Sequence, residues 1–469
     1  MNKKKVFRLS RWVHIFDCEN EVIALYHSLN IQTVFLEPYL KKIIGFLKNG
    51  TTLNHIIQNI NNVDSSTVIE CFNELVSDQF VVNIQDDESE LLEKKREENV
   101  IPVGMISLYL ILTDQCNLRC SYCFINNNMP ENHKRKDMTL DVAKKAVDIY
   151  FSNLSFNLPV HEKYDKTILF YGGEPLLKFN LIKEVVAYTK SQYGDVLSSM
   201  GEKFSFLLIT NGTLISQEVA DFLSENKEVS IAVSLDGEKI SHDKERKTIS
   251  GEGTFDDVVK GLRVLKESSC DVAVSCTISE SNIDELGSLL GLQEEFGFSS
   301  VNFNTLLDTE KGLVDDSYME KATNKMLQFF DLARAKGVYE DRIMRKLKSF
   351  VSQKIHAFDC QATGNQIVCS PDGGIGVCQE GVGSKQFFYG DVFSPFDFHK
   401  NVEINKWNNR TPLNMPQCYD CPAIGICGGG CSYSAWLRNG SVWSVDDRFC
   451  THSLVVLKWL INDLYKMLS

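Results

Sequence analysis

The sequence predicts an α/β fold, an open (β/α)6 barrel with a winged helix-turn-helix before it and a cysteine-rich region after it. First, the chain has 469 residues, more than one hydrophobic core usually serves, so we expect about three domains. Second, strand and helix patterns alternate between residues 106 and 335, which is typical of parallel strands joined by crossover helices. Third, beyond Lys354 this periodicity fades and glycine and cysteine become frequent.

The composition favours a folded globular protein and argues against several functional classes. Hydrophobic residues make up 43% of the chain and charged residues 24%, as in folded globular proteins. The net charge of −13 would repel a phosphate backbone, so we expect no nucleic-acid partner. No apolar run reaches the roughly 18 residues of a membrane span, so we expect no membrane role. The N-terminal residues lack an apolar secretion signal, so we expect a cytoplasmic location, where 15 cysteines bind metal more often than they form disulfides.

Residues 1–90 are predicted to form the winged helix-turn-helix. In its third helix Val68, Phe72 and Leu75 recur at helical spacing, and Asp64 or Ser65 can cap the first turn. The charged run over residues 86–98 predicts a linker helix or tether, and we set the linker at residues 91–104. The predicted strands cover residues 6–16, 22–28, 33–36 and 80–84, and the predicted helices cover residues 40–48, 53–60 and 65–78.

Residues 105–340 are predicted to form the barrel. Continuous apolar runs such as residues 167–170 are typical of strands that are covered on both faces. In a barrel of this type the chemistry belongs at the C-terminal ends of the strands. The predicted strands cover residues 106–112, 167–171, 204–210, 229–235, 272–277 and 299–304, and the helices residues 140–151, 181–191, 217–224, 255–266, 283–296 and 318–335.

Three cysteines, Cys116, Cys120 and Cys123, follow the first barrel strand at C-x3-C-x2-C spacing. Three thiolates can hold three irons of a [4Fe-4S] cube and leave the fourth iron open to a small molecule. The alternatives are a zinc knuckle that lacks a ligand and three incidental thiols.

This spacing resembles the radical S-adenosylmethionine (SAM) superfamily. The resemblance implies that Cys116, Cys120 and Cys123 are the catalytic metal ligands. It also implies that the open iron binds the amino and carboxylate groups of SAM. One electron from an external reductant then releases a 5′-deoxyadenosyl radical. Tyr122, before the last cysteine, matches the family residue that contacts adenine.

The second barrel strand ends in Gly172, Gly173 and Glu174. Glycines let the backbone approach a ligand, and a glutamate can accept hydrogen bonds from an ammonium. The segment resembles the family element that binds the SAM amino group, although such a sequence can also be an ordinary turn. By the same resemblance, Ser234 and Arg246 contact the ribose or carboxylate of SAM; the alternative for both is a capping or surface role.

Seven of the eight cysteines in the C-terminal region follow one pattern, Cys360-x12-Gly373-x4-Cys378, then Cys418-x2-Cys421-x5-Cys427-x3-Cys431, then Cys450. They resemble the SPASM domain, the two-cluster extension of radical SAM enzymes that modify peptides or proteins. We assign residues 341–469 to this domain. With the first cluster, the resemblance then implies three [4Fe-4S] clusters in all. The predicted fold is a partial (β/α)6 TIM-like barrel with a winged helix before it and an iron-sulfur domain after it. The alternative is a pair of structural zinc sites. The resemblance implies that the first auxiliary cluster binds Cys360, Cys378 and Cys431, and the second Cys418, Cys421, Cys427 and Cys450.

Two fully ligated auxiliary cubes need eight protein ligands, and this motif supplies seven. Cys369 lies between Cys360 and Cys378 and is the candidate for the missing ligand. A lone cysteine after Ile367 and Val368 is also typical of a buried apolar group. If Cys369 closes the first auxiliary cluster, that cluster has no open iron to bind a substrate thiolate. Outer-sphere transfer of the leftover electron to the cluster is then the better account of its role.

A winged helix fused to such an enzyme resembles the leader-binding element of ribosomal peptide maturases. An exposed strand edge between residues 6 and 36 could pair with an extended leader and raise the local concentration of the attached core peptide. The alternatives are a structural winged helix and a DNA-binding one. The second would use a basic face that consists of Lys3, Lys4, Lys5, Arg8 and Arg11.

These features together predict maturation of a ribosomally synthesised precursor peptide. We expect thioether crosslinks from a cysteine sulfur to a carbon of an acceptor residue, as sactipeptide and ranthipeptide maturases form. The enzymatic alternatives are carbon-carbon or aryl crosslinking of a peptide and conversion of a sulfatase residue to formylglycine. The non-enzymatic alternative is a zinc-stabilised peptide-binding adaptor. Asp236, Asp308 and Glu380 are candidates for a general base, and the sequence does not choose among them.

Overall fold

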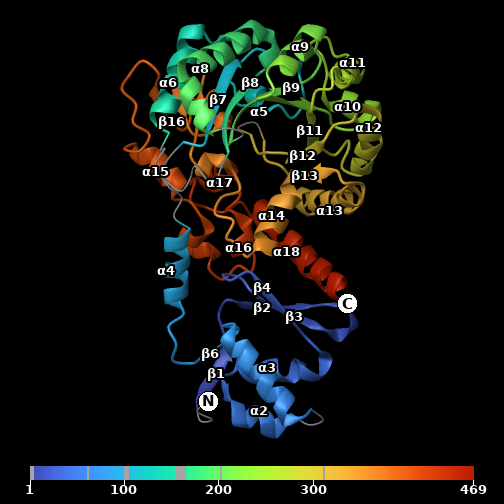
Figure 1. Cartoon of the computed structure of the whole chain (residues 1–469), viewed down its shortest axis with the longest axis vertical. Helices are drawn as coiled ribbons and strands as arrows, with labels where there is room; N and C mark the ends of the chain where they lie inside the picture. The colour runs from blue at the N-terminus through green and yellow to red at the C-terminus, as the bar shows by residue number, and fades with distance from the viewer. Residues whose placement is uncertain (1–4, 61–62, 100–104, 155–164, 201–202, 310–311) are drawn as a thin grey trace.

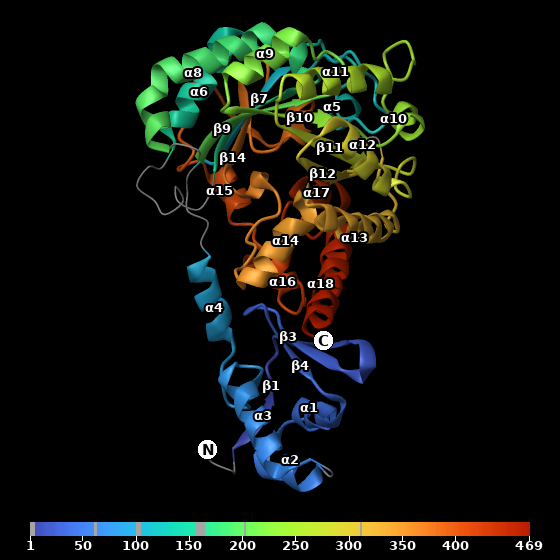
Figure 2. The same ribbon diagram turned by 45° about the vertical axis from the view of Figure 1, so that its right-hand side comes forward.

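The computed structural model describes residues 5–60, 63–99, 105–154, 165–200, 203–309 and 312–469. Lys3 and Lys4 of the predicted basic face lie outside the described residues. The N-terminal elements form one end of an elongated molecule and the barrel forms the other (Figure 1). The cysteine-rich C-terminal elements lie between them, as the turned view also shows (Figure 2). No helix among the described residues is both long enough and apolar enough to cross a membrane.

The N-terminal end combines three helices with a small sheet. Asp64 caps the third helix by accepting a hydrogen bond from the backbone N–H of Ser66. The sequence predicted one strand over residues 6–16, but the structure breaks it into two strands that join different sheets. The helices are α1 (Lys41–Lys48), α2 (Leu53–Asn59) and α3 (Ser65–Ser77), and the strands of this sheet are β5 (Thr51–Thr52), β1 (Val6–Leu9) and β6 (Val81–Asn83).

A second N-terminal sheet consists of β2 (Val13–Asp17), β3 (Ile23–His27) and β4 (Gln32–Leu36), all antiparallel. Every residue of β3 is buried. Its two faces serve different cores: Leu25 belongs to the core of the N-terminal helices, whereas the ring of Tyr26 stacks on Phe350 of the C-terminal half at 6.1 Å. Because other elements cover both faces of this sheet, only its edge strands β2 and β4 remain available for pairing with a further strand.

The edges of this second sheet carry outward backbone groups at alternate residues. The backbone N–H of Cys18 donates to the carbonyl of Val22, and the backbone N–H of Ser28 donates to the carbonyl of Trp12. These two bonds show which residue pairs between β2 and β3 are hydrogen-bonded. Ile15 on β2 and Thr33 on β4 therefore direct their backbone groups away from β3. Within the described ranges no further strand joins this sheet.

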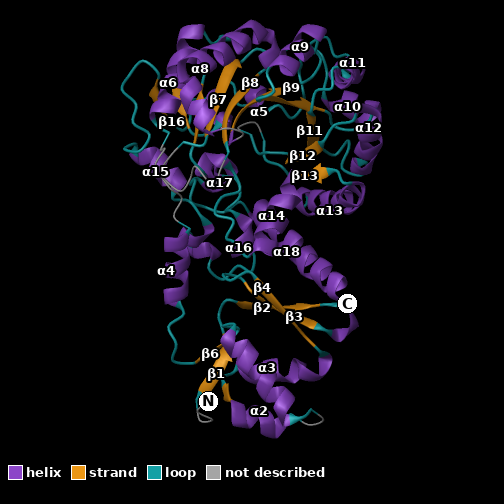
Figure 3. Ribbon diagram, viewed as in Figure 1, coloured by secondary structure: helices purple, strands orange, loops and turns teal. Residues whose placement is uncertain are grey.

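The barrel sheet confirms the predicted fold class. Six parallel strands lie side by side in chain order, and helices cover their outer face (Figure 3). The strands are β7 (Ser107–Thr113), β8 (Lys166–Gly172), β9 (Phe204–Thr210), β10 (Val229–Ser234), β11 (Val272–Ile278) and β12 (Ser300–Thr305), and β13 (Tyr339–Glu340) extends the edge. The helices are α6 (Leu140–Ser152), α8 (Phe179–Met200), α9 (Gln217–Glu225), α10 (Lys239–Glu245), α11 (Phe255–Glu267), α12 (Leu289–Phe296) and α13 (Tyr318–Lys336).

The C-terminal region continues the barrel sheet. β14 (Gln366–Cys369) pairs in parallel with β7, and β15 (Gly374–Gly376) and β16 (Phe388–Asp391) add antiparallel strands. The sheet therefore runs across the predicted boundary at residue 341. The helices of the linker, the cluster loop and this region are α4 (Ser89–Glu98), α5 (Phe124–Asn127), α14 (Asp341–Ser352), α15 (Val402–Asn408), α16 (Ile424–Cys427) and α17 (Ser432–Asn439).

The prediction that regular structure fades beyond Lys354 was wrong. The helix α18 (Asp447–Leu468) spans 22 residues and packs along α13. Trp407, Leu413 and Ile461 are buried in the same hydrophobic cluster as the barrel strands. Apolar packing therefore stabilises this region, which we had expected metal rather than a large core to hold together.

Candidate functional site

The three cysteines of the first motif lie on the loop that follows β7. Burial raises the pKa of Cys116 to about 12, and its electrostatic interactions with Glu174, Cys120 and Cys123 add to the increase. Burial also raises the pKa of Cys120 to about 11. The sulfur of Cys123 caps α5 by accepting from the backbone N–H of Asn126 at 3.5 Å. These thiols lie close enough to repel one another as thiolates, and a bound cation would relieve that repulsion.

Asp114, which the sequence did not single out, anchors this loop. Its buried carboxylate lies 2.6 Å from Nε2 of His133 and accepts from the backbone N–H of Lys136 at 2.8 Å. Its backbone carbonyl accepts from Arg135 at 2.5 Å. An aspartate directly after a buried strand was the available signal. Through these contacts Asp114 joins the start of the cysteine loop to the segment that leads into α6.

Gly172 and Gly173 let the end of β8 approach the cysteine loop. A Cβ atom at Gly173 would lie 2.0 Å from the carbonyl oxygen of Gln115, so only glycine fits. The backbone N–H of Gly173 donates to the carbonyl of Thr113 at 2.8 Å, and that of Glu174 donates to Gln115 at 2.9 Å. We expected these glycines to admit a ligand. In the structure the segment they admit is the loop that carries Cys116.

Glu174 is fully buried at the junction of β8 and β9. Its carboxylate accepts hydrogen bonds from the hydroxyl of Thr210 at 2.6 Å, from the backbone N–H of Asn211 at 2.8 Å and from that of Leu176 at 3.0 Å. Burial nevertheless raises the pKa of Glu174. Its donors come from this chain, so a contact between Glu174 and the SAM ammonium stays a prediction.

Arg246, Asp236 and Tyr122 form a buried network beside Cys120. Nε of Arg246 lies 2.8 Å from Oδ2 of Asp236, which also accepts from the hydroxyl of Tyr122. The guanidinium carbon lies 5.4 Å from the centre of the Tyr122 ring, a cation–π contact. Burial raises the pKa of Cys120, and the positive charge of Arg246 opposes this increase. The carboxylate of Asp236 is occupied, which argues against a role as a general base.

The structure places the other strand-end residue, Ser234, at the last position of β10, where it is buried and in register with Ser275. Its predicted contact with SAM stays a prediction, as does that of Arg246.

The C-terminal cysteines form two groups. Burial raises the pKa of Cys378, and the charges of Glu380, Cys360 and Cys431 add to the increase. In the second group burial raises the pKa of Cys450 to about 12, with contributions that come from Cys427, Cys421 and Cys418. This is the division that the family resemblance implied; the ligand roles themselves stay predictions.

All 15 cysteines are free thiols in the structure. Across the described ranges, no three His, Cys, Asp or Glu side chains converge closely enough to hold a single metal ion. The choice between iron-sulfur clusters and zinc stays a prediction.

Cys369 lies in the core of the sheet, and its role as a cluster ligand stays a prediction. It is fully buried in β14, where it pairs with Leu110 of β7. Burial raises the pKa of Cys369 to about 12, and the charged groups that act on it are Lys385 and Asp372 rather than other cysteines. Its surroundings match those of a core residue.

Arg410 interacts electrostatically with cysteines of both auxiliary groups, and no sequence pattern singled it out. Its side chain has no exposed surface and donates to the carbonyls of Gly429 at 2.8 Å and Ser444 at 2.9 Å. Burial lowers the pKa of Arg410, and the cysteines that oppose this shift come from both groups. Among the described residues no carboxylate forms an ion pair with it. The cysteines concerned are Cys431, Cys427, Cys418 and Cys360.

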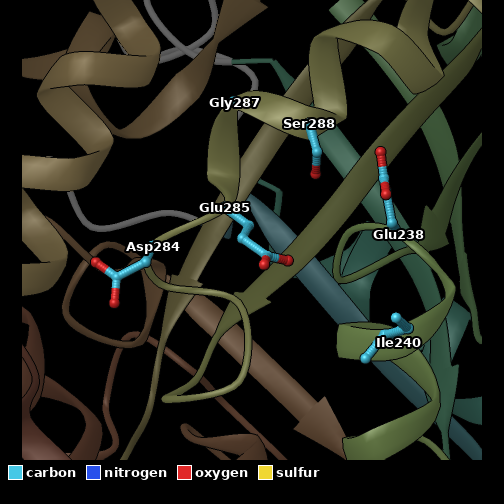
Figure 4. A pocket seen from close by; sticks show the side chains of 6 residues that line it. All are labelled: Glu238, Ile240, Asp284, Glu285, Gly287 and Ser288. Carbon is cyan, nitrogen blue, oxygen red and sulfur yellow. The ribbon is translucent and has the colours of Figure 1, made fainter.

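A hollow of about 400 Å³ lies beside the loops that follow β10 and β11 (Figure 4). Three carboxylates line it, and Asp284 is bound from outside by Lys321 and Lys325. The hollow contains none of the predicted ligands, so we assign no cofactor to it. Its lining residues are Glu238, Ile240, Asp284, Glu285, Gly287 and Ser288.

Comparison with protein families decides the class of the barrel. The model of the radical SAM superfamily matches residues 110–290, which include the cysteine loop, the glycine segment and Arg246. The protein is a radical SAM enzyme. Enzymes of this superfamily bind a [4Fe-4S] cluster and SAM, and a solved structural neighbour of this radical SAM enzyme contains bound AdoMet.

Three known proteins resemble this radical SAM enzyme over much of its length. The radical SAM cyclopropyl synthase TigE of Paramaledivibacter caminithermalis is 24% identical over 98% of this chain and 94% of its own. The structure of anSMEcpe with bound AdoMet has a TM-score of 0.63 and 20% identity, and covers 78% of this chain and 95% of its own. The structure of Streptococcus suis SuiB bound to precursor peptide SuiA has a TM-score of 0.51 and 13% identity, and covers 95% of this chain and 99% of its own. These likenesses confirm the fold.

Proposed function

We propose that this radical SAM enzyme matures a ribosomally made precursor peptide. When bound, the cluster and SAM supply a 5′-deoxyadenosyl radical that removes a hydrogen atom from the peptide. The observation that carries the proposal is the combination in one chain of three features. These are a radical SAM loop at a strand end, two further cysteine groups, and an N-terminal sheet with open edges.

Cys116, Cys120 and Cys123 are the proposed ligands of the first cluster. The network of Arg246, Asp236 and Tyr122 would fix the loop beside Cys120. Ser234 and Glu174 are proposed to complete the SAM site, together with the backbone of Gly172 and Gly173.

Residues 341–469 are the proposed SPASM domain with two auxiliary [4Fe-4S] clusters. The donor set fits, because cysteines of both groups interact electrostatically with one buried cation, Arg410. Buried thiolates of like charge repel one another unless a cation neutralises them, and iron provides that charge. Counting the first cluster, the enzyme would hold about twelve irons and twelve sulfides per chain.

Residues 1–90 are the proposed leader-recognition domain, joined to the barrel by the linker at residues 91–104. Both faces of the sheet β2–β3–β4 are packed against other elements, so an extended peptide can add only at an edge. The outward backbone groups of Ile15 and Thr33 offer the hydrogen bonds that such a strand needs. The SuiB structure with its precursor peptide supports a peptide substrate.

Two kinds of new bond fit this proposal. The sequence favoured a thioether from a cysteine sulfur to an acceptor carbon. The full-length similarity to a cyclopropyl synthase favours the carbon-carbon alternative. Each bond removes two hydrogen atoms from the peptide, so mass alone does not separate the two.

The test is to search beside the gene for a short open reading frame that encodes a cysteine-containing peptide, and to co-express that peptide with the enzyme under anaerobic conditions. We expect the peptide to lose the mass of two hydrogen atoms for each bond. Alkylation then separates the candidates: a thioether blocks one cysteine from iodoacetamide, whereas a carbon-carbon bond leaves every cysteine reactive. The variant with Cys116, Cys120 and Cys123 changed to Ala is the control and should leave the peptide unmodified. An unmodified peptide with the wild-type enzyme, in the presence of SAM cleavage, would contradict a peptide substrate.

A further inference from the structure

Glu380 is a buried carboxylate without a partner. It stands two residues after Cys378, in the 3-10 turn Gln379–Val382, and only 3% of its surface is exposed. Its Oε2 atom makes no hydrogen bond to any described residue, and no Lys, Arg or His forms an ion pair with Glu380 in the described ranges. A buried carboxylate in this condition is costly unless a cation or a metal compensates it.

The charge of Glu380 acts on all three cysteines of the first auxiliary group, and also on Cys123 of the cysteine loop. It is the first electrostatic influence on Cys378, and it also acts on Cys360 and Cys431. These three cysteines are the whole proposed ligand set of the first auxiliary cluster. Among the described carboxylates, Glu380 is therefore the one whose charge acts on all three cysteines of that ligand set. Cys369, the candidate from the sequence, lies among Lys385, Asp372 and the core of the sheet instead.

We infer that the carboxylate of Glu380 is the fourth protein ligand of the first auxiliary cluster. The inference rests on the proposed function, because it requires a [4Fe-4S] cube at Cys360, Cys378 and Cys431. Three thiolates leave one iron without a protein ligand, and an anionic oxygen is a competent iron donor. Binding to iron would also give the orphaned Oε2 atom a partner.

This assignment gives the cluster one corner that differs from the others. A carboxylate is a harder donor than a thiolate and binds iron of a sulfide cluster less tightly. The corner held by Glu380 is then the one at which a thiol from outside can replace a protein ligand. Cys369 has no part in the ligation and serves the packing between β14 and β7.

The test uses the full chain with Cys116, Cys120 and Cys123 changed to Ala, so that only the auxiliary clusters contribute. In this background we compare Glu380→Gln, Glu380→Cys and Cys369→Ser after anaerobic reconstitution, by iron and sulfide analysis, Mössbauer spectroscopy and electron paramagnetic resonance. Gln keeps the shape but is a poor anionic ligand; Cys supplies a thiolate.

We expect Glu380→Gln to lose one iron per chain on brief oxidation and to give the signal of a three-iron cluster. We expect Cys369→Ser to match the parent, and Glu380→Cys to keep all its iron with an altered Mössbauer subsite. An unchanged spectrum in Glu380→Gln, the same loss in Cys369→Ser, or equal loss in Glu380→Gln and Glu380→Cys would overturn the assignment. A parent that binds only the cluster of the second group would instead overturn the proposed function, and this inference with it.

Discussion

Arg246 and Asp236 form a buried ion pair next to the cluster loop, with Nε and Oδ2 2.8 Å apart. The same carboxylate accepts from the backbone N–H of Thr277 at 2.9 Å. The pair therefore joins the segment after β10 to the end of β11, and Tyr122 brings the cysteine loop to it.

Replacement of Asp236 by Asn should weaken SAM binding and SAM cleavage. It leaves the Arg246 charge buried without its counter-ion, which costs about 3–5 kcal/mol in comparable pairs. We expect deoxyadenosine formation to fall by at least about tenfold, measured by chromatography together with equilibrium dialysis of SAM. Asp256→Asn, which breaks an exposed pair with Lys239, is the matched control. Equal activity of the two variants would contradict a positioning role for Asp236.

Arg410 should set the reduction potentials of both auxiliary clusters. A buried cation stabilises the more negative, reduced form of a nearby cluster, and Arg410 acts on cysteines from both groups. Arg410→Met should therefore lower both auxiliary midpoint potentials and leave that of the first cluster unchanged. A redox titration followed by electron paramagnetic resonance measures this. Arg334→Met is the control, since Arg334 pairs with Asp463 far from the cysteines of either group. Unshifted auxiliary potentials would refute the effect.

Proline at a sheet edge should reveal where the leader binds. Thr33→Pro removes an outward N–H from β4, and Ile15→Pro removes one from β2, while the ladder bonds to β3 remain. Each removes about 1 kcal/mol of hydrogen bonding and adds a steric block, so affinity should fall by about tenfold at the edge in use. Binding of a fluorescent leader peptide to both variants measures this. Each variant is the control for the other, and unchanged affinity in both would exclude strand addition.

Glu340 should make folding stability depend on pH. Burial raises the pKa of Glu340 from 4.5 to about 7, although the backbone N–H groups of Arg342 and Ile343 oppose the shift. Because the folded pKa is the higher one, the folded state binds more protons between these values. The contribution of Glu340 to stability is thus largest below about pH 4.5 and declines as pH rises toward about 7, by at most roughly 3 kcal/mol.

Glu340→Gln removes this titration and keeps an acceptor for the helix cap. The unfolding temperature of the wild type, relative to that of Glu340→Gln, should rise from pH 7.5 to pH 5. A difference that does not vary with pH would show that Glu340 titrates normally.

Much of the barrel could be predicted because its patterns are local. The strand over residues 204–210 was predicted to the residue, since its buried and half-buried positions alternate within one continuous apolar run. The cysteine spacing likewise lies in the sequence itself. The network of Arg246, Asp236 and Tyr122 could not be predicted, because it joins residues from three separate loops whose proximity only the folded barrel creates.

The C-terminal region was harder for two different reasons. β14 and β15 have four and three residues, too few for a period, and β14 pairs with β7, which lies more than 250 residues earlier in the chain. In α18, by contrast, Phe449, Val456 and Leu460 lie at helical spacing, so the sequence does carry a signal for this helix.

The ladder between β7 and β14 also bears on electron transfer between the proposed clusters. β7 leads into the loop of Cys116, and β14 leads through a hairpin into β15 and then to Cys378. One continuous sheet therefore carries both cysteine segments. Tunnelling rates fall steeply with distance, so this shared sheet would keep the distance between the first proposed cluster and the first auxiliary one constant.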